Sequence, residues 1–279
     1  MIHKKPVPID SLPGRRIIEH NMNKSAKLAE LRRSLARYGL PPDRPPIALG
    51  HPQADAVLGG GLRPGALHEV FAQGWSAGGF AALLATLAAR NSFNGKGGPL
   101  FWIRPDYEAM EYGAISPSGL LELGGDPKAL ILLRTRNTAD ALCAAGDILA
   151  CAHVGAVLLA VEGMPKCLDL AASRRLAFAA GESGATILVL RNGAAPAPSA
   201  ALTRWQVTSA SSHSDDDAHD DDWGNPVFAA QLIRHRLGGL GSFQMRWNPS
   251  NVCFETADTG AVVSAPAGRS LYSQERRAV

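Results

Sequence analysis

The chain has 279 residues, 46% of them hydrophobic and 19% charged, a composition typical of a globular protein with a sizeable core. Its basic N-terminus lacks the apolar segment of a secretory signal, and the longest apolar stretch, 81–89, is too short to span a membrane. We therefore expect a cytoplasmic protein that contacts no membrane. The four cysteines form no C-x-x-C pair and share no metal-ligand spacing with histidine, so we expect isolated, buried free thiols in a reducing compartment and no metal site.

The net charge of +3 is unevenly distributed along the chain. Residues 1–44 contain ten Lys/Arg and four Asp/Glu, a net charge of +6, which leaves −3 for the remainder. A basic arm suits contact with an acidic protein or with nucleic acid, although a solvated tail has the same composition. We expect any DNA binding to be weak or indirect and sensitive to salt, since phosphate contacts of this kind are screened. The candidate DNA-contacting residues are Arg15, Arg16, Lys24, Lys27, Arg32 and Arg33.

The first predicted element is an amphipathic helix over residues 25–38. Ser25 can cap its N-terminus, Gly39 ends it, and a proline-rich linker, 40–46, follows. One face carries an apolar stripe at helical spacing, formed by Leu28, Leu31, Leu35 and Tyr38. Because so short a helix is unstable alone in water, this stripe must pack on the body of the protein, on a second copy or on a partner.

From residue 47 the pattern changes to alternating strands and helices. Strands are predicted at 65–71, 99–103, 129–134, 156–161 and 185–190, and helices at 81–90, 138–151 (with a Thr138 cap) and 168–181. Fully apolar strands separated by helices indicate an α/β fold, a mostly parallel twisted sheet with helices on both faces. After Asn192 the pattern is typical of antiparallel strands at one edge. We therefore expect a core over 47–256 and a flexible tail over 257–279.

An acidic segment interrupts this core. Residues 213–222 contain six aspartates, together with His213 and His219. Carboxylates suit hard cations, but consecutive aspartates do not converge on one point and repel one another. We predict a disordered loop over 211–223, with metal binding as the alternative.

The most informative motif follows the first core strand. A working phosphate loop reads G-x-x-x-x-G-K-[ST], in which the lysine contacts the β- and γ-phosphates and the hydroxyl holds Mg²⁺. Here GWSAGGFA places Gly74 and Gly79 at the glycine positions, Phe80 at the lysine position and Ala81 at the hydroxyl position. Neither substitute can perform the lost role, so we expect no cofactor, no metal and no ATP hydrolysis.

The segment over residues 49–81 resembles the part of the RecA recombinase family that leads into the nucleotide-binding loop. The matching parts are Asp55, Leu58, Gly59, Gly60, Gly61, Pro64, Gly65, Glu69, Val70 and Phe71. The resemblance implies a RecA-like fold. It also implies that Asp106 stands at the catalytic carboxylate, Ala160 or Glu162 at the metal-binding acid, and Asn192 at the γ-phosphate sensor, although Asn192 also suits a turn. The two loops that contact DNA in that family would be short here, 163–169 and 193–200, with Arg174 and Arg175 nearby as DNA-contacting or merely solvated residues.

Across residues 25–256 the chain resembles the ImuA family, on the order and spacing of LFWIRPD, GLLELGGDP, LDLAASRRLAFAA and AALTRWQV. The resemblance implies a nucleoid-associated, non-catalytic accessory protein of error-prone translesion synthesis in the SOS response to DNA damage. It further implies contact with an inactive Y-family polymerase homologue (ImuB-like), and with RecA or an error-prone C-family polymerase. Self-association through the helix 25–38 is a further expectation. Two alternatives remain: an atypical ATPase that uses Asp106 and Glu162, and a SulA-like cell-division inhibitor, a class that also resembles a reduced RecA core.

Overall fold

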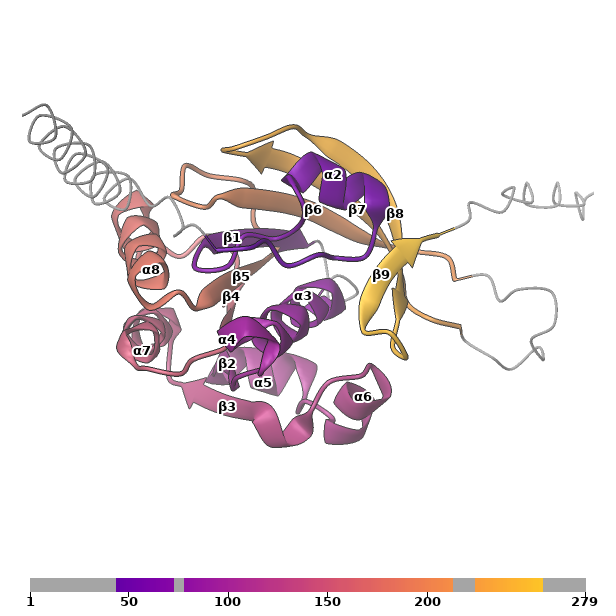
Figure 1. Ribbon diagram of the computed structural model, residues 1–279. Helices are drawn as coiled ribbons and strands as arrows, with labels where there is room; N and C mark the ends of the chain where they lie inside the picture. The colour runs from indigo at the N-terminus through magenta and orange to yellow at the C-terminus, as the bar shows by residue number, and fades with distance from the viewer. Residues whose placement is uncertain (1–43, 73–77, 213–223, 258–279) are drawn as a thin grey trace, which may run out of the picture.

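The computed structural model describes residues 44–72, 78–212 and 224–257. The predicted helix 25–38, the whole acidic segment 213–222 and the tail from residue 258 lie outside these ranges. Nine strands of the described chain form one sheet in the order β3-β2-β4-β5-β1-β6-β7-β8-β9 (Figure 1). They are β1 (Leu67–Ala72), β2 (Leu100–Pro105), β3 (Leu130–Thr135), β4 (Ala156–Glu162), β5 (Thr186–Asn192), β6 (Thr203–Ala210), β7 (Val227–His235), β8 (Gly241–Asn248) and β9 (Cys253–Thr256).

Six neighbouring strands, from β3 to β6, run parallel, and β7, β8 and β9 extend the sheet with antiparallel pairs. This arrangement confirms the predicted fold class. The described helices are α2 (Pro52–Leu58), α3 (Gly78–Arg90), α4 (Ser92–Gly95), α5 (Asp106–Tyr112), α6 (Pro117–Glu122), α7 (Thr138–Ala150) and α8 (Leu170–Ser183), with a short 3-10 helix, η3 (Pro127–Ala129). Within these ranges no helix is both long and apolar enough to cross a bilayer.

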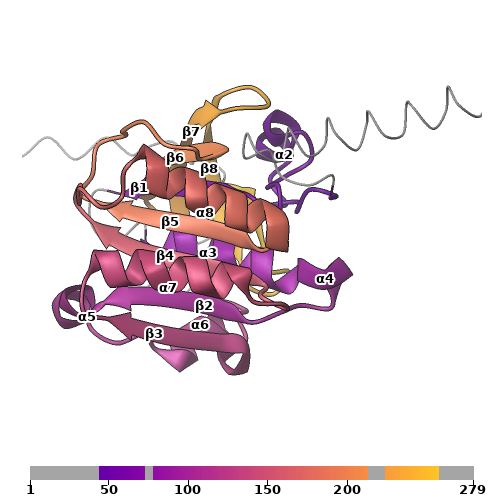
Figure 2. The ribbon, with the colours of Figure 1, turned by 90° about the vertical axis from the view of Figure 1, so that its left-hand side faces the viewer.

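Helices cover the two faces of the parallel part of the sheet. α7 and α8 pack side by side on one face, and α3 lies behind the sheet on the other (Figure 2). Each face carries its own apolar cluster, because the side chains of a strand alternate between the two faces. Strands that are buried on both faces are apolar over most of their length, which is why β4 and β5 could be predicted from the sequence.

The strand expected at 129–134 is present as β3, but the expectation that this apolar strand is buried was wrong. β3 lies at the edge of the sheet, and Ile131 and Leu132 on it are 43% and 48% exposed. An apolar run identifies a strand, but it cannot distinguish the centre of a sheet from its edge.

Helix boundaries show two further differences from the prediction. The cap of α7 is Asn137, whose side chain accepts a hydrogen bond from the backbone of Asp140, and Thr138 is the first helical residue. The prediction missed four short helices, α2, α4, α5 and α6, since four to seven residues do not establish a helical period.

Candidate nucleotide site at the carboxyl edge of the sheet

The carboxyl ends of the parallel strands meet at one edge, where an α/β fold places its ligand site. At this edge β1 ends at Ala72, and α3 begins at Gly78. Gly74 lies outside the described residues, whereas Gly79 is the second residue of α3. A Cβ atom added at Gly79 would lie 3.7 Å from the ring of Phe228, an ordinary contact distance. The second glycine of the motif is therefore not required by packing.

Phe80, at the lysine position, is a core residue. Its side chain has no exposed surface and points into an aromatic cluster beneath the sheet. Its ring centroid lies 5.2 Å from that of Phe254, 5.5 Å from that of Phe228 and 5.8 Å from that of Trp205. Aromatic pairs at these separations stabilise one another beyond simple burial. The first turn of α3 thus anchors the antiparallel extension to the sheet.

Ala81, at the hydroxyl position, is also fully buried. A methyl side chain has no oxygen with which to hold a magnesium ion. Both positions, Phe80 and Ala81, therefore belong to the hydrophobic core and carry neither an ammonium group nor a hydroxyl group.

The carboxylates expected from the RecA resemblance are both engaged by neighbours. Asp106 accepts a hydrogen bond from Arg134 Nε at 2.9 Å, in an ion pair that is half-exposed. Glu162 accepts one from Asn192 Nδ2, also at 2.9 Å. Asn192 is the buried last residue of β5, so its interpretation as a turn residue was wrong. Ala160 is buried within β4, which leaves Glu162 as the acid at the strand end.

A buried ion pair that was not predicted stands at the same edge. Arg104, on β2, donates from Nε to Glu108, on α5, and both side chains are almost fully buried. Burial raises the pKa of Glu108; the Arg104 guanidinium opposes this shift, and the nearby charge of Glu162 adds to it. This pair fixes α5 to the end of β2.

A second buried cluster joins three strands beneath the loop 193–200. Arg204 Nη2 donates to Ser199 Oγ at 2.7 Å, and Ser199 Oγ donates to Glu69 Oε2 at 2.7 Å. Arg204 Nε lies 2.9 Å from the same carboxylate oxygen, and Arg191 Nη1 lies 3.6 Å from Oε1. Burial lowers the pKa of both guanidinium groups, and Glu69 opposes the shift. The sequence signal for this cluster is a charged residue inside each of three otherwise largely apolar strands, namely Glu69, Arg191 and Arg204.

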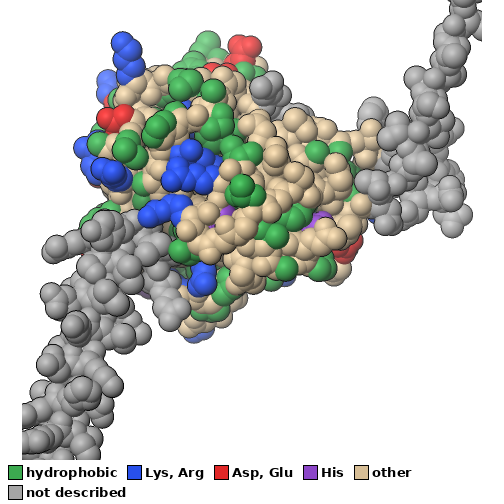
Figure 3. Space-filling view, turned by 90° about the horizontal axis from the view of Figure 1, so that it is seen from above, with side chains coloured by type: hydrophobic (Ala, Val, Ile, Leu, Met, Phe, Trp, Pro, Cys, Tyr) green, Lys and Arg blue, Asp and Glu red, His purple; other side chains and the backbone are tan. Residues whose placement is uncertain are grey.

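The other predicted contact residues are not brought together at this edge. Arg174 and Arg175 are exposed on α8. In the view from above, Lys and Arg side chains gather toward the left of the face (Figure 3). The described residues contain no group of three metal-ligating side chains. The expectation of buried thiols was wrong, since three of the four free cysteines, Cys143, Cys151 and Cys167, are exposed and Cys253 is partly buried. The remaining candidates lie outside the described residues: Leu28, Leu31, Leu35, Tyr38, Arg15, Arg16, Lys24, Lys27, Arg32 and Arg33.

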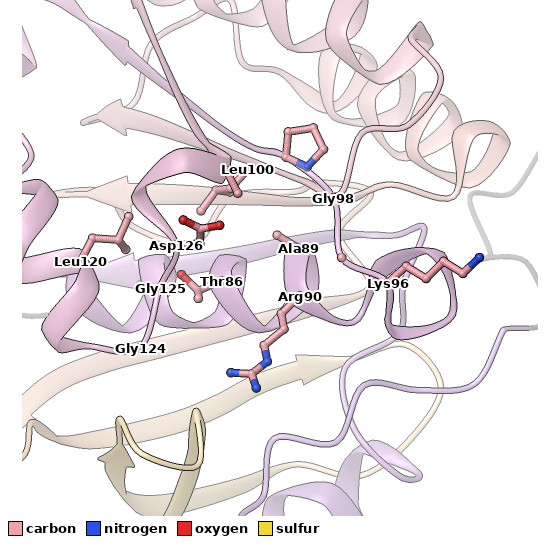
Figure 4. Close-up of a pocket in the computed structure, with 13 residues that line it drawn as sticks. Thr86, Ala89, Arg90, Lys96, Gly98, Leu100, Leu120, Gly124, Gly125 and Asp126 are labelled. Atoms are coloured by element: carbon pink, nitrogen blue, oxygen red, sulfur yellow. The ribbon is translucent and has the colours of Figure 1, made fainter.

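A pocket of about 560 Å³ lies at the opposite end of α3. Thr86 and Asp126 line its centre, while Arg90 and Lys96 project in different directions (Figure 4). The two cations do not converge, so the pocket does not replace the lost phosphate site.

The fold that these features define is RecA-like. No protein-family model and no curated protein matches the chain. Among solved structures, the chain is similar to one described as the crystal structure of the RadB recombinase. The similarity has a TM-score of 0.52 and 16% sequence identity, and it covers 76% of this chain and 100% of that one.

Proposed function

We propose that this protein is a non-catalytic RecA-like accessory factor of DNA repair, specifically of error-prone translesion synthesis in the damage response. The observation that supports it best is the burial of Phe80 among three aromatic rings. A RecA-like fold that has filled its phosphate-binding position with core can serve as a scaffold for other proteins. The resemblance to the ImuA family supplies the pathway.

The proposed partners are the inactive Y-family polymerase homologue (ImuB-like), and RecA or an error-prone C-family polymerase. The predicted helix 25–38 is the proposed contact, for a partner or for a second copy. The ion pair of Asp106 with Arg134 supports the absence of catalysis, because a general base must be free to accept a proton from the attacking group.

The experiment has two parts, a binding assay with purified proteins and a mutagenesis assay in a strain that lacks the chain. The chain is immobilised and tested against the inactive polymerase homologue and against RecA, with and without ATP and Mg²⁺. We expect specific binding to the polymerase homologue that is unaffected by nucleotide, and a loss of damage-induced mutagenesis in cells that lack the chain. Normal mutagenesis in the deletion strain would contradict the proposal, as would binding that requires ATP.

A further inference from the structure

A hollow of about 430 Å³ lies between α7 and α8, the two helices that stand in front of the sheet in Figure 2. α7 lines it from Ala139 to Gly146 and α8 lines it from Ala172 to Ala179. Each helix contributes four residues at the spacing i, i+3, i+4 and i+7, which lie on one side of a helix. Figure 2 shows no described element over the space between the two helices. We call this hollow the α7–α8 groove.

The groove has room for more than its own lining. A Cβ atom added at Gly146 would meet no neighbouring atom within 4 Å, and the thiols of Cys143 and Cys167, which also line the groove, are exposed and free. Glycine in the middle of a helix weakens it, so α7 keeps this glycine at a cost to its own stability. Two helices whose facing residues are small let a third helix approach closely. The shape of the groove therefore fits the apolar side of another helix.

The N-terminal arm of the same chain joins the body beside this groove. Arg44, the first described residue, donates from Nη1 to the carbonyl of Gly184 at 3.3 Å, and Gly184 caps the C-terminal end of α8. The carbonyl of Arg44 accepts a hydrogen bond from Arg63 at 3.4 Å. These two contacts fix the point at which the arm meets the body, at one end of α8.

The length of the linker matches the length of the groove. From Tyr38 to Arg44 the chain takes six steps, and a proline-rich linker covers about 3.1 Å per residue, hence about 19 Å. Along α8, at a rise of about 1.5 Å per residue, Ala172 lies about 18 Å from Gly184. The linker therefore spans from Gly184 to the Ala172 end, which places Tyr38 there and directs the predicted helix 25–38 antiparallel to α8. Its apolar stripe is about 15 Å long, enough to cover the groove.

The charges of the two surfaces favour the same occupant. Residues 25–38 contain four Lys/Arg and one Glu, a net charge of +3, whereas α7 contains Asp140 and Asp147 and no Lys or Arg. These aspartates stand three and four residues from Cys143, on the side of α7 that lines the groove, and Asp140 also pairs with Arg136. Because Arg175 lines the opposite side of the groove, we expect the basic residues of the occupant over α7.

We propose that the predicted helix 25–38 packs in the α7–α8 groove of its own chain, antiparallel to α8 and with its apolar stripe facing the groove. A helix this short needs such a surface, because it is unstable alone in water. The inference goes beyond the proposed function, which assigns the same helix to a partner or to a second copy. In the free chain the helix covers its own body, and a partner binds the stripe only after displacing the helix from the groove.

The test is the alkylation rate of each cysteine in the purified full chain, measured with iodoacetamide and peptide mass spectrometry. Leu31→Glu with Leu35→Glu should release the helix and raise the rates of Cys143 and Cys167 about tenfold, since a covered thiol reacts only while its cover is open. Cys151 is exposed and does not line the groove, so its rate should stay the same and serves as the internal control.

The matched control variant is Ala29→Glu with Ala36→Glu, which adds the same charge to the helix away from the apolar stripe. It should keep the wild-type rates of both groove thiols. Equal rates in the two double variants would overturn the proposal. The measurement uses no partner, so it can fail while the binding assay of the proposed function succeeds, and the reverse.

A disulfide distinguishes the chain's own helix from that of a second copy. In a chain whose other three cysteines are replaced by serine, Tyr38→Cys should form a disulfide with Cys167 within one chain under mild oxidation, at every protein concentration. Leu28→Cys, at the other end of the stripe, should not. Gly146→Gln fills the groove from α7 without weakening that helix, and it should prevent the disulfide. A disulfide-linked dimer would overturn the proposal in favour of a second copy, and a bond from Leu28→Cys in place of Tyr38→Cys would contradict the antiparallel arrangement.

Discussion

Restoring the phosphate-loop lysine should damage this protein instead of reviving it. Phe80→Lys removes a fully buried ring from its contacts with Trp205, Phe228 and Phe254. Truncating a buried phenylalanine costs about 3–5 kcal/mol, and an unpaired ammonium in the same place adds a desolvation cost. Domains of ordinary stability have only about 5–15 kcal/mol in total. We therefore expect Tm to fall by on the order of 10 °C or more.

The assay is thermal and urea unfolding followed by circular dichroism. Phe178→Lys is the matched control, because Phe178 on α8 is 40% exposed and the chemical change is identical. We expect the control to change the free energy of unfolding by about 0.5 kcal/mol or less. If Phe80→Lys is as stable as Phe178→Lys, or if Phe80→Lys with Ala81→Ser binds ATP, the assignment of this position to the core is refuted.

Three further predictions concern other parts of the chain. Glu69→Gln should lower the free energy of unfolding, measured by urea titration, by about 3–5 kcal/mol, because it leaves two arginines buried without a counter-charge. In the same titration Asp106→Asn, at an exposed pair, should lower it by about 1 kcal/mol or less. Burial lowers the pKa of His68 to about 4, so His68 stabilises the fold fully above its unfolded pKa of 6.5 and progressively less as pH falls toward 4. Urea unfolding should therefore show a loss of roughly 2.5 kcal/mol between about pH 7.5 and 4.5 that His68→Gln removes. Leu31→Glu with Leu35→Glu should leave the circular dichroism spectrum unchanged but abolish self-association or partner capture, measured by light scattering and pulldown; normal assembly would place the interface elsewhere.

Most of the parallel sheet could be predicted because its strands are buried on both faces. Such strands are apolar over most of their length, as in β4 and β5, and the helices between them carry a 3.6-residue period. The exposure of β3 could not be predicted, since the position of a strand in the sheet depends on pairings between distant segments. The register that sets Asp106 beside Arg134 is non-local in the same way.

At the candidate site, the sequence predicted which functional groups are missing better than it predicted which side chains contact one another. The spacing of Gly79, Phe80 and Ala81 showed that lysine and hydroxyl were missing, but not that the phenylalanine ring would turn into the core. The cluster around Glu69 forms because the strand order β5-β1-β6 places Arg191 and Arg204 on either side of it. No local pattern in the chain reveals that order.

The most direct test of the central claim is steady-state ATP hydrolysis by the purified chain in the presence of Mg²⁺, alone and with single-stranded DNA. With Phe80 in the core and Asp106 paired to Arg134, we predict no turnover above the buffer blank and the same rate for Asp106→Ala. Turnover that is proportional to protein concentration and abolished by Asp106→Ala would contradict the account.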